Sequence, residues 1–550
     1  MAAVGDEAGM KTTVAIDSLA IRDGRVFGWG WLLHEKLSAR HIEIRVPMMA
    51  GEPARLSCLR GVNRPDLAKA FPDVAHAAGG GFLIQGRIHG DVASDASLFV
   101  TYEDGSSEQH EIIGFPYRFV AIAAEPQVLR EKAGNAMRLL RRAGLRSLLA
   151  RVWQLGRERL DRSRGHRELA KVAAAAEQAE CVIIFDHAMG GGANHFRNTL
   201  VLQHLRMGRV LYLVTPDLPT LSYRVTRQTA DSHGIADYPT LPEALAVIEP
   251  LSPGIIIIND LVSFDDPQAV LAWASARRNA GARLLFYLHD FLSACPSWTL
   301  MNDRDRFCDL PDATTCRLCL ARNAVPFLSF YPEAEVPTWR AMWREFFERC
   351  DEIVAFSSAS VELLLRAHPT LPRERIQIRP HEIDYLPARV LQPSLASPLV
   401  VAVIGNISLH KGADVVRDAV AHAKATQAPI RFVVIGTVVN GIASDMLTIT
   451  GPYVAAELPD LLERHRVGIC LLPSVCPETF SYVTAEIIHF GMPLAVFNLG
   501  APAERARNYS RGIILDGMDG KSVVEGLLAF HATLVGNAQT QQQQGSQVSI

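Results

Sequence analysis

Apolar and polar residues alternate through the first part of the chain, over residues 1–120. Short alternating runs such as "TVAIDSLAIRDGRVFGWGWL" and "SLFVTYEDGS" are separated by glycine and Asp-Gly turns. A period of two is the pattern of a strand with one buried face, and glycine turns join such strands into hairpins. The pattern predicts an antiparallel accessory β domain of the sandwich type over residues 1–120.

A basic helical linker is predicted next, over residues 121–178. Between residues 130 and 171 thirteen Lys or Arg stand against four Asp or Glu, a local charge of +9, and leucines recur at helical spacing. A basic amphipathic helix over residues 125–171 is typical of a segment that lies on an anionic membrane surface. An interdomain helix with a solvated basic face is the alternative, and both interpretations stay open.

From residue 179 the pattern changes to strand, loop and helix in repetition. Continuous apolar runs such as "CVIIFD" and "GIIIIND" alternate with helical patterns, as in parallel sheets buried on both faces. A Pro-rich stretch separates two such series, over residues 179–390 and 391–535. The pattern predicts an α/β fold with two Rossmann-like domains that face a cleft, where ligands bind at the carboxyl ends of the strands. The glutamine-rich tail, 536–550, is expected to be disordered.

Composition narrows the possible functions. The formal net charge is -3 over 550 residues, which gives no reason to expect a nucleic-acid partner. No apolar run of about 18 residues predicts a transmembrane helix. The first residues lack the basic-then-apolar pattern of a signal peptide, and nine cysteines form no disulfide framework. We expect a cytoplasmic protein that is peripheral on the inner face of the cell membrane if the basic helix binds there.

A candidate phosphate site follows the first strand of the last domain, in "VIGNISLHKG". The strand is expected to end at Gly405, and Lys411 to precede a helix. A lysine at a helix N-terminus can pair with phosphate oxygens while backbone N–H groups add positive character. A glycine turn with a solvent-exposed lysine is the alternative.

The segment "PETFSYVTAE" places two glutamates around an expected strand-to-helix turn. Glu478 is expected in the loop, Glu486 in the second turn of the helix, and Thr479 or Ser481 at its N-cap. On a continuous helix the glutamates would be about 12 Å apart and on different faces, so shared acid–base chemistry is not expected. The amides of Thr479, Phe480 and Ser481 would face an anion between them. This layout suits a diphosphate flanked by hydroxylated rings, which is the chemistry of a nucleotide sugar.

With these motifs in view, residues 180–535 resemble a GT-B glycosyltransferase of the retaining family-4 group. The segment "LLPSVCPETFSYVTAEIIHFGMPLAVFNLGAPAER" carries the donor-domain signature of bacterial surface-polysaccharide transferases. The resemblance implies that Glu486 binds the donor ribose and Glu478 the donor sugar near the reacting centre. It implies that Lys411 holds the diphosphate. Asn406 stands where the family commonly has an arginine, so one phosphate contact is missing.

The resemblance extends to three further segments. The loop Gly451, Pro452 and Tyr453 is similar to the segment that cradles the nucleotide base. "DHAMGGGANHF", with Gly190, Gly191 and Gly192, is similar to the family's glycine-rich loop. "LLFYLHD" places His289 where the family often has a histidine close to the donor sugar; an ordinary polar residue at a strand end is the alternative. The resemblance thus names Glu478, His289 and Lys411 as the residues nearest the chemistry.

Four cysteines follow His289 in a C-x12-C-x7-C-x2-C pattern, Cys295, Cys308, Cys316 and Cys319. Four thiolates at such spacing can hold a tetrahedral structural zinc. A loop with unligated thiols is the alternative. No cofactor is expected for catalysis itself.

The predicted reaction is transfer of a sugar from a nucleotide-diphosphate sugar to a hydroxyl of a glycan or lipid-linked acceptor, in surface polysaccharide synthesis. Retention of configuration is implied by the resemblance. Two alternatives remain: a non-catalytic assembly protein with a degenerate transferase domain, and another GT-B enzyme such as a nucleotide-sugar epimerase. The substitution at Asn406 favours the first alternative, and the intact glutamate pair opposes it.

Overall fold

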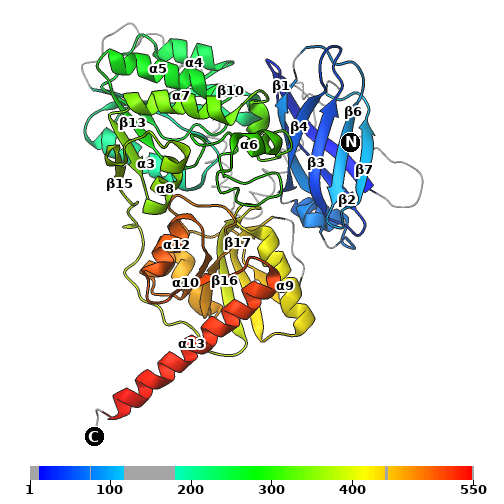
Figure 1. Ribbon diagram of the computed structural model, residues 1–550, viewed down its shortest axis with the longest axis vertical. Coiled ribbons are helices and arrows are strands. Elements are labelled where there is room, and N and C mark those ends of the chain that lie inside the picture. Colours follow the sequence, from blue (N-terminus) through cyan, green and yellow to red (C-terminus); the bar gives the residue numbers. More distant parts are fainter. Residues whose placement is uncertain are drawn as a thin grey trace, which may run out of the picture.

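The first domain is one antiparallel sheet of seven strands in the computed structural model, which describes residues 12–62, 64–74, 76–88, 90–116, 180–439 and 444–547 (Figure 1). The strand order is β1-β2-β5-β4-β3-β6-β7. The strands are β1 (Thr12–Arg22), β2 (Arg25–His34), β3 (Ala39–Val46), β4 (Ala54–Val62), β5 (Gly81–Arg87), β6 (Ala96–Tyr102) and β7 (Ser107–Ile112), and the helix α1 (Pro65–Ala70) follows β4.

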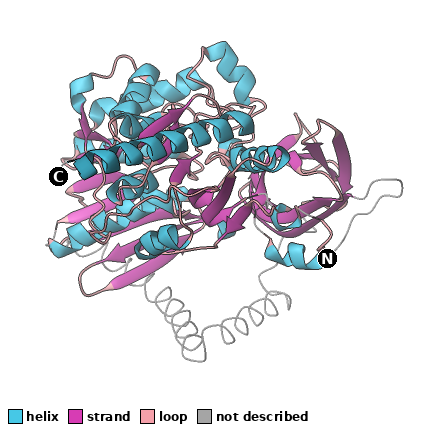
Figure 2. Cartoon of the chain, turned by 90° about the horizontal axis from the view of Figure 1, so that it is seen from below, coloured by secondary structure: helices cyan, strands magenta, loops and turns pink. Residues whose placement is uncertain are grey.

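This sheet differs from the expected sandwich, because a single sheet curls around its own core. The Thr12 hydroxyl on β1 donates to Glu108 on β7 at 2.6 Å and lies 2.9 Å from the Tyr102 hydroxyl on β6. Strand twist accumulates across seven strands, and a bulge between Ile16 and Ser18 adds to it. The two outer strands therefore meet through side chains, and the core lies inside the curl (Figure 2).

The second domain contains an eight-stranded sheet in the order β11-β10-β9-β8-β12-β13-β14-β15. Its strands are β8 (Cys181–Phe185), β9 (Val210–Asp217), β10 (Ser222–Gln228), β11 (His233–Tyr238), β12 (Ile255–Ile258), β13 (Arg283–Tyr287), β14 (Glu352–Ala355) and β15 (Ile376–Ile378). Six are parallel neighbours, whereas β10 and β11 form an antiparallel hairpin on one edge. The apolar runs form the buried central strands, as the sequence predicts.

Helices cover both faces of this sheet (Figure 1). They are α3 (Gly191–Arg206), α4 (Leu241–Ile248), α5 (Pro267–Asn279), α6 (Ala313–Leu320), α7 (Val336–Arg349) and α8 (Ser358–Ala367). Two N-caps show why helices begin where they do: the Thr240 side chain accepts from the Glu243 amide and Asp266 from the Ala269 amide. Each thereby satisfies an amide that has no partner within the helix.

The third domain is a parallel six-stranded sheet in the order β18-β17-β16-β19-β20-β21. Its strands are β16 (Leu399–Ile407), β17 (Ile430–Val438), β18 (Leu447–Ile449), β19 (Ile469–Leu472), β20 (Leu494–Phe497) and β21 (Gly512–Leu515). Its helices are α9 (Ala413–Thr426), α10 (Leu458–Arg464), α11 (Tyr482–His489), α12 (Gly500–Arg507) and α13 (Gly520–Gln547). Apolar clusters fill both faces of the sheet, so the predicted α/β fold is confirmed.

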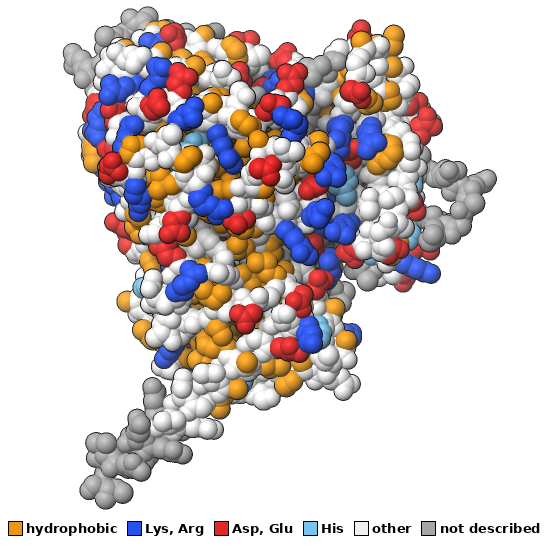
Figure 3. Space-filling model, in the orientation of Figure 1, with side chains coloured by type: hydrophobic (Ala, Val, Ile, Leu, Met, Phe, Trp, Pro, Cys, Tyr) orange, Lys and Arg blue, Asp and Glu red, His pale blue; other side chains and the backbone are white. Residues whose placement is uncertain are grey.

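The curled β domain contacts both α/β domains. Arg60 bonds to Asp414 at the start of α9 at 3.1 Å. Toward the second domain, Asp265 faces Arg25 and Arg87, each at 3.3 Å, and the Gln85 side chain accepts the Phe327 amide at 2.7 Å. Figure 3 shows Lys and Arg side chains gathered along this seam. The β domain therefore bridges the other two.

The tail differs from the expected disorder, because α13 continues to Gln547 and projects away from the body (Figure 1). Alanine and glutamine are good helix formers, so a polar run that follows a packed helix can extend it. The predicted linker, 121–178, and with it the membrane-binding helix, lies outside the described residues. Among the helices that the structure describes, none is long and apolar enough to cross a membrane.

Candidate functional site

Most of the predicted site residues meet where the carboxyl ends of the strands of the second and third domains face each other, here called the interdomain junction. The Thr479 hydroxyl donates to the His289 carbonyl oxygen across the junction at 2.9 Å. A Cβ on Gly192 would lie 3.2 Å from the Tyr482 ring. The second domain thus brings its glycine-rich loop and His289 against the start of α11.

The loop that carries Lys411, here called the lysine loop, lies directly against residues 473–475, which lead into "PETFS". The Val475 amide donates to the His410 carbonyl oxygen at 3.0 Å. Gly412 caps α9 with φ 85°, and a Cβ there would lie 1.9 Å from the Pro473 carbonyl oxygen, so only glycine permits this approach. Lys411 is half-buried and forms no salt bridge within the described part of the chain. Its ammonium group is therefore available for an anion.

Lys411 and Glu478 both lie close to the Cys476 thiol. Burial raises the pKa of this thiol to about 12; Glu478 raises it further and Lys411 lowers it. Glu478 is half-buried and accepts a hydrogen bond from the Ser474 hydroxyl. A carboxylate and an ammonium therefore flank one short loop without pairing with each other.

Glu486 lies in the second turn of α11, as predicted, and is buried at 6% exposure. The Tyr385 hydroxyl donates to its Oε1 at 2.7 Å. Burial raises the pKa of Glu486, while Tyr385 and His195 lower it. The second carboxylate oxygen remains for a ligand such as a diol.

The start of α11 provides free backbone donors. Ser481 is the N-cap, one of the two predicted, and its side chain accepts the Thr484 amide at 3.4 Å. Its φ of 68° is unusual for a residue with a side chain. Over the residues that the structure covers, the amides of Thr479, Phe480 and Ser481 donate no hydrogen bond. Unpaired amides beside a helix N-terminus form an anion-binding arrangement.

The Phe480 side chain joins the two domains. It is 4% exposed and packs in one cluster with Val182, Ile184 and Phe356 of the second domain. The Arg505 guanidinium lies 3.9 Å from its ring centroid. The sequence does not distinguish this apolar anchor from a residue that lines the site, because its partners come from the other domain.

A group of aromatic rings and histidines surrounds His289. Its Nε2 lies 3.1 Å from Asn259 Oδ1, and burial followed by His381 and His187 lowers the pKa of His289 well below its ordinary value. His381 stacks between His289 and Tyr482, at 5.6 and 5.0 Å. Burial lowers the pKa of His381 to about 3. Both imidazoles are neutral at pH 7, and the lone His381 has no sequence motif that could have revealed it.

Glycines with positive φ shape the glycine-rich loop and the ends of β16 and β17. Gly190 caps α3 with φ 84°, and Gly191 has φ 82°. Gly405 and Gly436 pair on β16 and β17, and a Cβ on Gly436 would lie 2.1 Å from the Gly405 carbonyl oxygen. Asn406 is exposed and accepts from the Thr437 hydroxyl at 2.9 Å.

The predicted base loop follows β18 at the edge of the third sheet. The Gly451 amide donates to the Gly436 carbonyl oxygen at 3.0 Å, and Pro452 is exposed. Burial raises the pKa of Tyr453, and Glu486 raises it further. Tyr453 therefore belongs to the surroundings of Glu486, and this loop lies on the same side of the domain as the glutamate.

The four-thiolate zinc site stays a prediction, and the four cysteines lie near one another, since in addition to burial Cys308, Cys316 and Cys319 all raise the pKa of Cys295. Across the described ranges, no three His, Cys, Asp or Glu side chains are arranged to hold a metal ion. Cys316 and Cys319 lie on α6; the Cys316 thiol donates to the Pro311 carbonyl oxygen, and Cys319 accepts from Asn323. Cys295 and Cys308 pack in an apolar cluster. These contacts describe the thiols without a metal ion.

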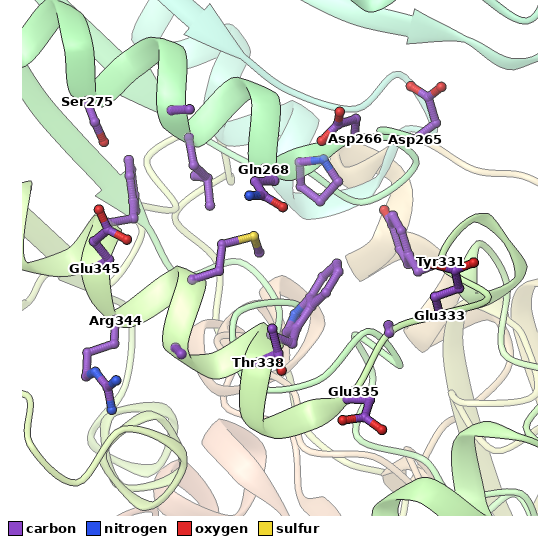
Figure 4. A pocket seen from close by; sticks show the side chains of 18 of the residues that line it. Asp265, Asp266, Gln268, Ser275, Tyr331, Glu333, Glu335, Thr338, Arg344 and Glu345 are labelled. Atoms are coloured by element: carbon purple, nitrogen blue, oxygen red, sulfur yellow. The ribbon is translucent and has the colours of Figure 1, made fainter.

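A cavity of about 1360 Å³ lies outside the interdomain junction, between α5 and α7 (Figure 4). Its walls include Leu271, Trp339 and Met342, and carboxylates such as Glu333 and Glu345 stand at its rim. None of the predicted site residues lines it. The cavity therefore does not form part of the candidate site.

Comparison with known proteins characterises the third domain. Residues 398–532 match the family model described as glycosyl transferases group 1. The matched residues run from β16 into α13, so the third domain is similar to group 1 glycosyltransferase domains. No curated protein sequence matches the chain significantly.

Solved glycosyltransferase structures are similar at low identity. Anabaena HepE in complex with UDP-glucose is 15% identical over 65% of this chain and 90% of that chain, with a TM-score of 0.39. A glycosyltransferase from Rickettsia africae is 12% identical over 65% and 89%, with a TM-score of 0.42. The lipopolysaccharide outer core galactosyltransferase WaaB is 13% identical over 58% and 81%, with a TM-score of 0.36.

Proposed function

We propose that the chain is a glycosyltransferase that moves a sugar from a nucleotide-diphosphate sugar to a hydroxyl of a glycan or lipid-linked acceptor. One observation carries the proposal: Lys411, without a salt bridge among the described residues, lies on a loop bonded to the segment of the unpaired Thr479, Phe480 and Ser481 amides. Both belong to a domain that matches a glycosyltransferase family model. A cation and free amides at one edge favour an anionic donor.

In this proposal the diphosphate is the leaving group. Lys411 and the amides at the start of α11 stabilise the charge that develops on the departing phosphate, and such fixed donors act most strongly where water is excluded. Glu486 binds the ribose through the carboxylate oxygen that Tyr385 leaves free. Glu478 and the neutral His289 position the transferred sugar by accepting or donating single hydrogen bonds to hydroxyls.

Retention of configuration and a role in bacterial surface polysaccharide synthesis complete the proposal, on the resemblance of the donor motifs. The departing phosphate then takes the proton of the acceptor hydroxyl, so no separate base is required. The basic segment of residues 125–171 would hold the enzyme at an anionic membrane surface, where a lipid-linked acceptor lies.

The test is thermal stabilisation of the purified full chain by nucleoside diphosphates and their sugars. Lys411→Ala should weaken binding of the stabilising nucleotide about 10- to 100-fold, because a hydrogen bond to a charged group contributes about 1.5–3 kcal/mol. Lys424→Ala is the matched control, since Lys424 lies at the other end of α9 and pairs with Asp445.

Stabilisation by one nucleotide sugar, followed by glycan growth with release of the nucleoside diphosphate, would support the proposal. Stabilisation by none of them, with equal behaviour of Lys411→Ala and Lys424→Ala, would instead favour a non-catalytic assembly protein. Release of a free, altered nucleotide sugar without glycan growth would indicate an epimerase.

A further inference from the structure

A row of buried and half-buried polar groups lies beneath the glycine-rich loop, at the carboxyl edge of three adjacent strands. Asp186 and His187 follow β8, Asp260 follows β12 and Asp290 follows His289 after β13. Arg197 on α3 pairs with Asp186 at 3.0 Å. This pair neutralises one carboxylate, while Asp260 and Asp290 have no such cation among the described residues.

His187 connects this row to the glycine-rich loop. The Met189 amide donates to His187 Nδ1 at 3.1 Å, so Nδ1 is an acceptor and the ring proton lies on Nε2. Nε2 faces Asp260 Oδ2 at 3.4 Å. Burial lowers the pKa of His187, so the ring is neutral. The neutral imidazole therefore lies between Asp260 and the backbone that leads into Gly190, and it contacts both.

Asp260 and Asp290 form a hydrogen bond with each other, which requires a proton on one of them. Asp260 Oδ1 accepts the Val262 amide at 2.8 Å, and Oδ2 lies 3.4 Å from His187 Nε2, so both of its oxygens face N–H groups. Asp290 accepts only the Leu292 amide, at 2.6 Å. The proton therefore belongs on the second oxygen of Asp290.

The surroundings favour retention of this proton. Burial raises the pKa of Asp260 to about 8 and raises that of Asp290 well above its ordinary value, and neighbouring carboxylates add to both shifts. The titratable and charged groups facing the pair are Asp186 and His187 after β8, Arg197 on α3, His289 after β13 and Tyr331 before α7. The Arg197 cation is already paired with Asp186.

We propose that Asp290 is a positioning residue: by holding a proton for Asp260, it fixes His187 and through it the glycine-rich loop at the interdomain junction. The assignment rests on the proposed function in one respect, that this loop contacts donor or acceptor. When the proton is lost at alkaline pH, the adjacent carboxylates of Asp260 and Asp290 repel each other, and the contact between Asp260 and His187 is broken. The loop is then released from its position against Tyr482.

Two isosteric substitutions distinguish this arrangement from simple packing. In Asp290→Asn the amide NH₂ donates to Asp260 permanently, and its oxygen still accepts the Leu292 amide. In Asp260→Asn the same amide group must either face the N–H of His187 or give up the Val262 amide, so one acceptor is lost. The change in volume is equal in the two variants, and only the hydrogen-bond direction differs.

Three measurements on the full chain test the proposal. Asp290→Asn should keep the donor KM within about threefold of wild type at pH 7 and lose the alkaline decline in activity. Asp260→Asn should raise the donor KM at least about tenfold, since an acceptor of a buried donor is missing. Hydrogen exchange of the 187–192 backbone should be at least about tenfold faster in Asp260→Asn than in Asp290→Asn.

Infrared spectroscopy provides a measurement that needs no activity. The wild-type protein at pH 7 should show the carbonyl stretch of a buried protonated carboxylic acid, and Asp290→Asn should lack it. Absence of this band in wild type, or equal exchange in the two variants, would overturn the proposal. If the chain transfers no sugar, the band and the exchange rates still decide whether Asp290 holds the loop, so a failure of the proposed function is recognised separately.

Discussion

Gly412 is a residue where the packing of the third domain leaves no room for a side chain. It lies between Lys411 and α9 with φ 85°, against the backbone of Pro473. In Gly412→Ala the added Cβ would stand 1.9 Å from the Pro473 carbonyl oxygen and 2.7 Å from its carbonyl carbon. Because the contacted atoms are backbone, the lysine loop and the segment that leads to Glu478 must move apart.

The loss of stability in Gly412→Ala has two contributions. A left-handed backbone conformation costs a residue with a side chain about 1–2 kcal/mol relative to glycine. Overpacking of a tight contact costs about 1–3 kcal/mol more. Gly412→Ala should therefore lower the free energy of unfolding by about 2–5 kcal/mol.

Gly451→Ala is the matched control in the same domain. Gly451 also has φ 85°, but a Cβ there meets nothing within 4 Å. It carries only the backbone contribution, so its loss should be about 1–2 kcal/mol. The difference between the variants isolates the contact between the two loops.

Differential scanning calorimetry gives the loss of stability, and hydrogen exchange of β16 and α9 assigns it to the third domain. Nucleotide titration should show weaker binding in Gly412→Ala, since the shift carries Lys411 with it. Equal destabilisation in the two variants would refute the reasoning, because the close approach to Pro473 would then have no energetic consequence.

Three further predictions follow from the contacts described. Acidification from pH 7 to 5 should destabilise the fold, because burial lowers the pKa of His368 to about 4. The stability that depends on the neutral imidazole is fully present above the unfolded pKa of about 6.5 and is lost as the pH falls toward the folded pKa. His368 should account for a fall of about 2 kcal/mol in the free energy of unfolding between these pH values. In calorimetry the Tm of His368→Gln should fall less than that of wild type from pH 7 to 5. An equal fall in Tm would contradict this. Phe480→Ala should cost about 3–5 kcal/mol and accelerate hydrogen exchange in α3, whereas unchanged exchange would show that the ring does not join the domains. Gly500→Ala should weaken nucleotide-sugar binding at least about tenfold, because its Cβ would lie 2.6 Å from the Glu478 carbonyl oxygen and would displace Glu478. Calorimetric titration measures the Kd, and an unchanged Kd would argue against a role of Glu478 in binding.

The strand edges and the start of α11 could be predicted from the sequence because their causes are local. Continuous apolar runs mark strands buried on both faces, and polar residues follow where such a strand ends. Ser481 caps α11 through its own side chain, which is a contact within four residues. The separate environments of Glu478 and Glu486 follow from the same boundary between loop and helix.

The remaining features depend on contacts that are distant along the chain. Phe480 and His381 take their roles from rings of the opposite domain, and no periodicity records such partners. Cysteine spacing predicts a metal site, which stays a prediction, but it does not record that Cys295 packs against an apolar cluster. The curl of the first sheet depends on contacts between β1 and β7, almost one hundred residues apart.

The bridging β domain has a mechanical consequence for the whole molecule. Two bodies joined by a single connecting segment can rotate about many axes, but a third body attached to both removes most of these rotations. While Arg60 holds Asp414 and Arg25 holds Asp265, the permitted rotation axis passes near the β domain. An opening motion of the interdomain junction is then hinged at the β domain and widest on the side opposite to it.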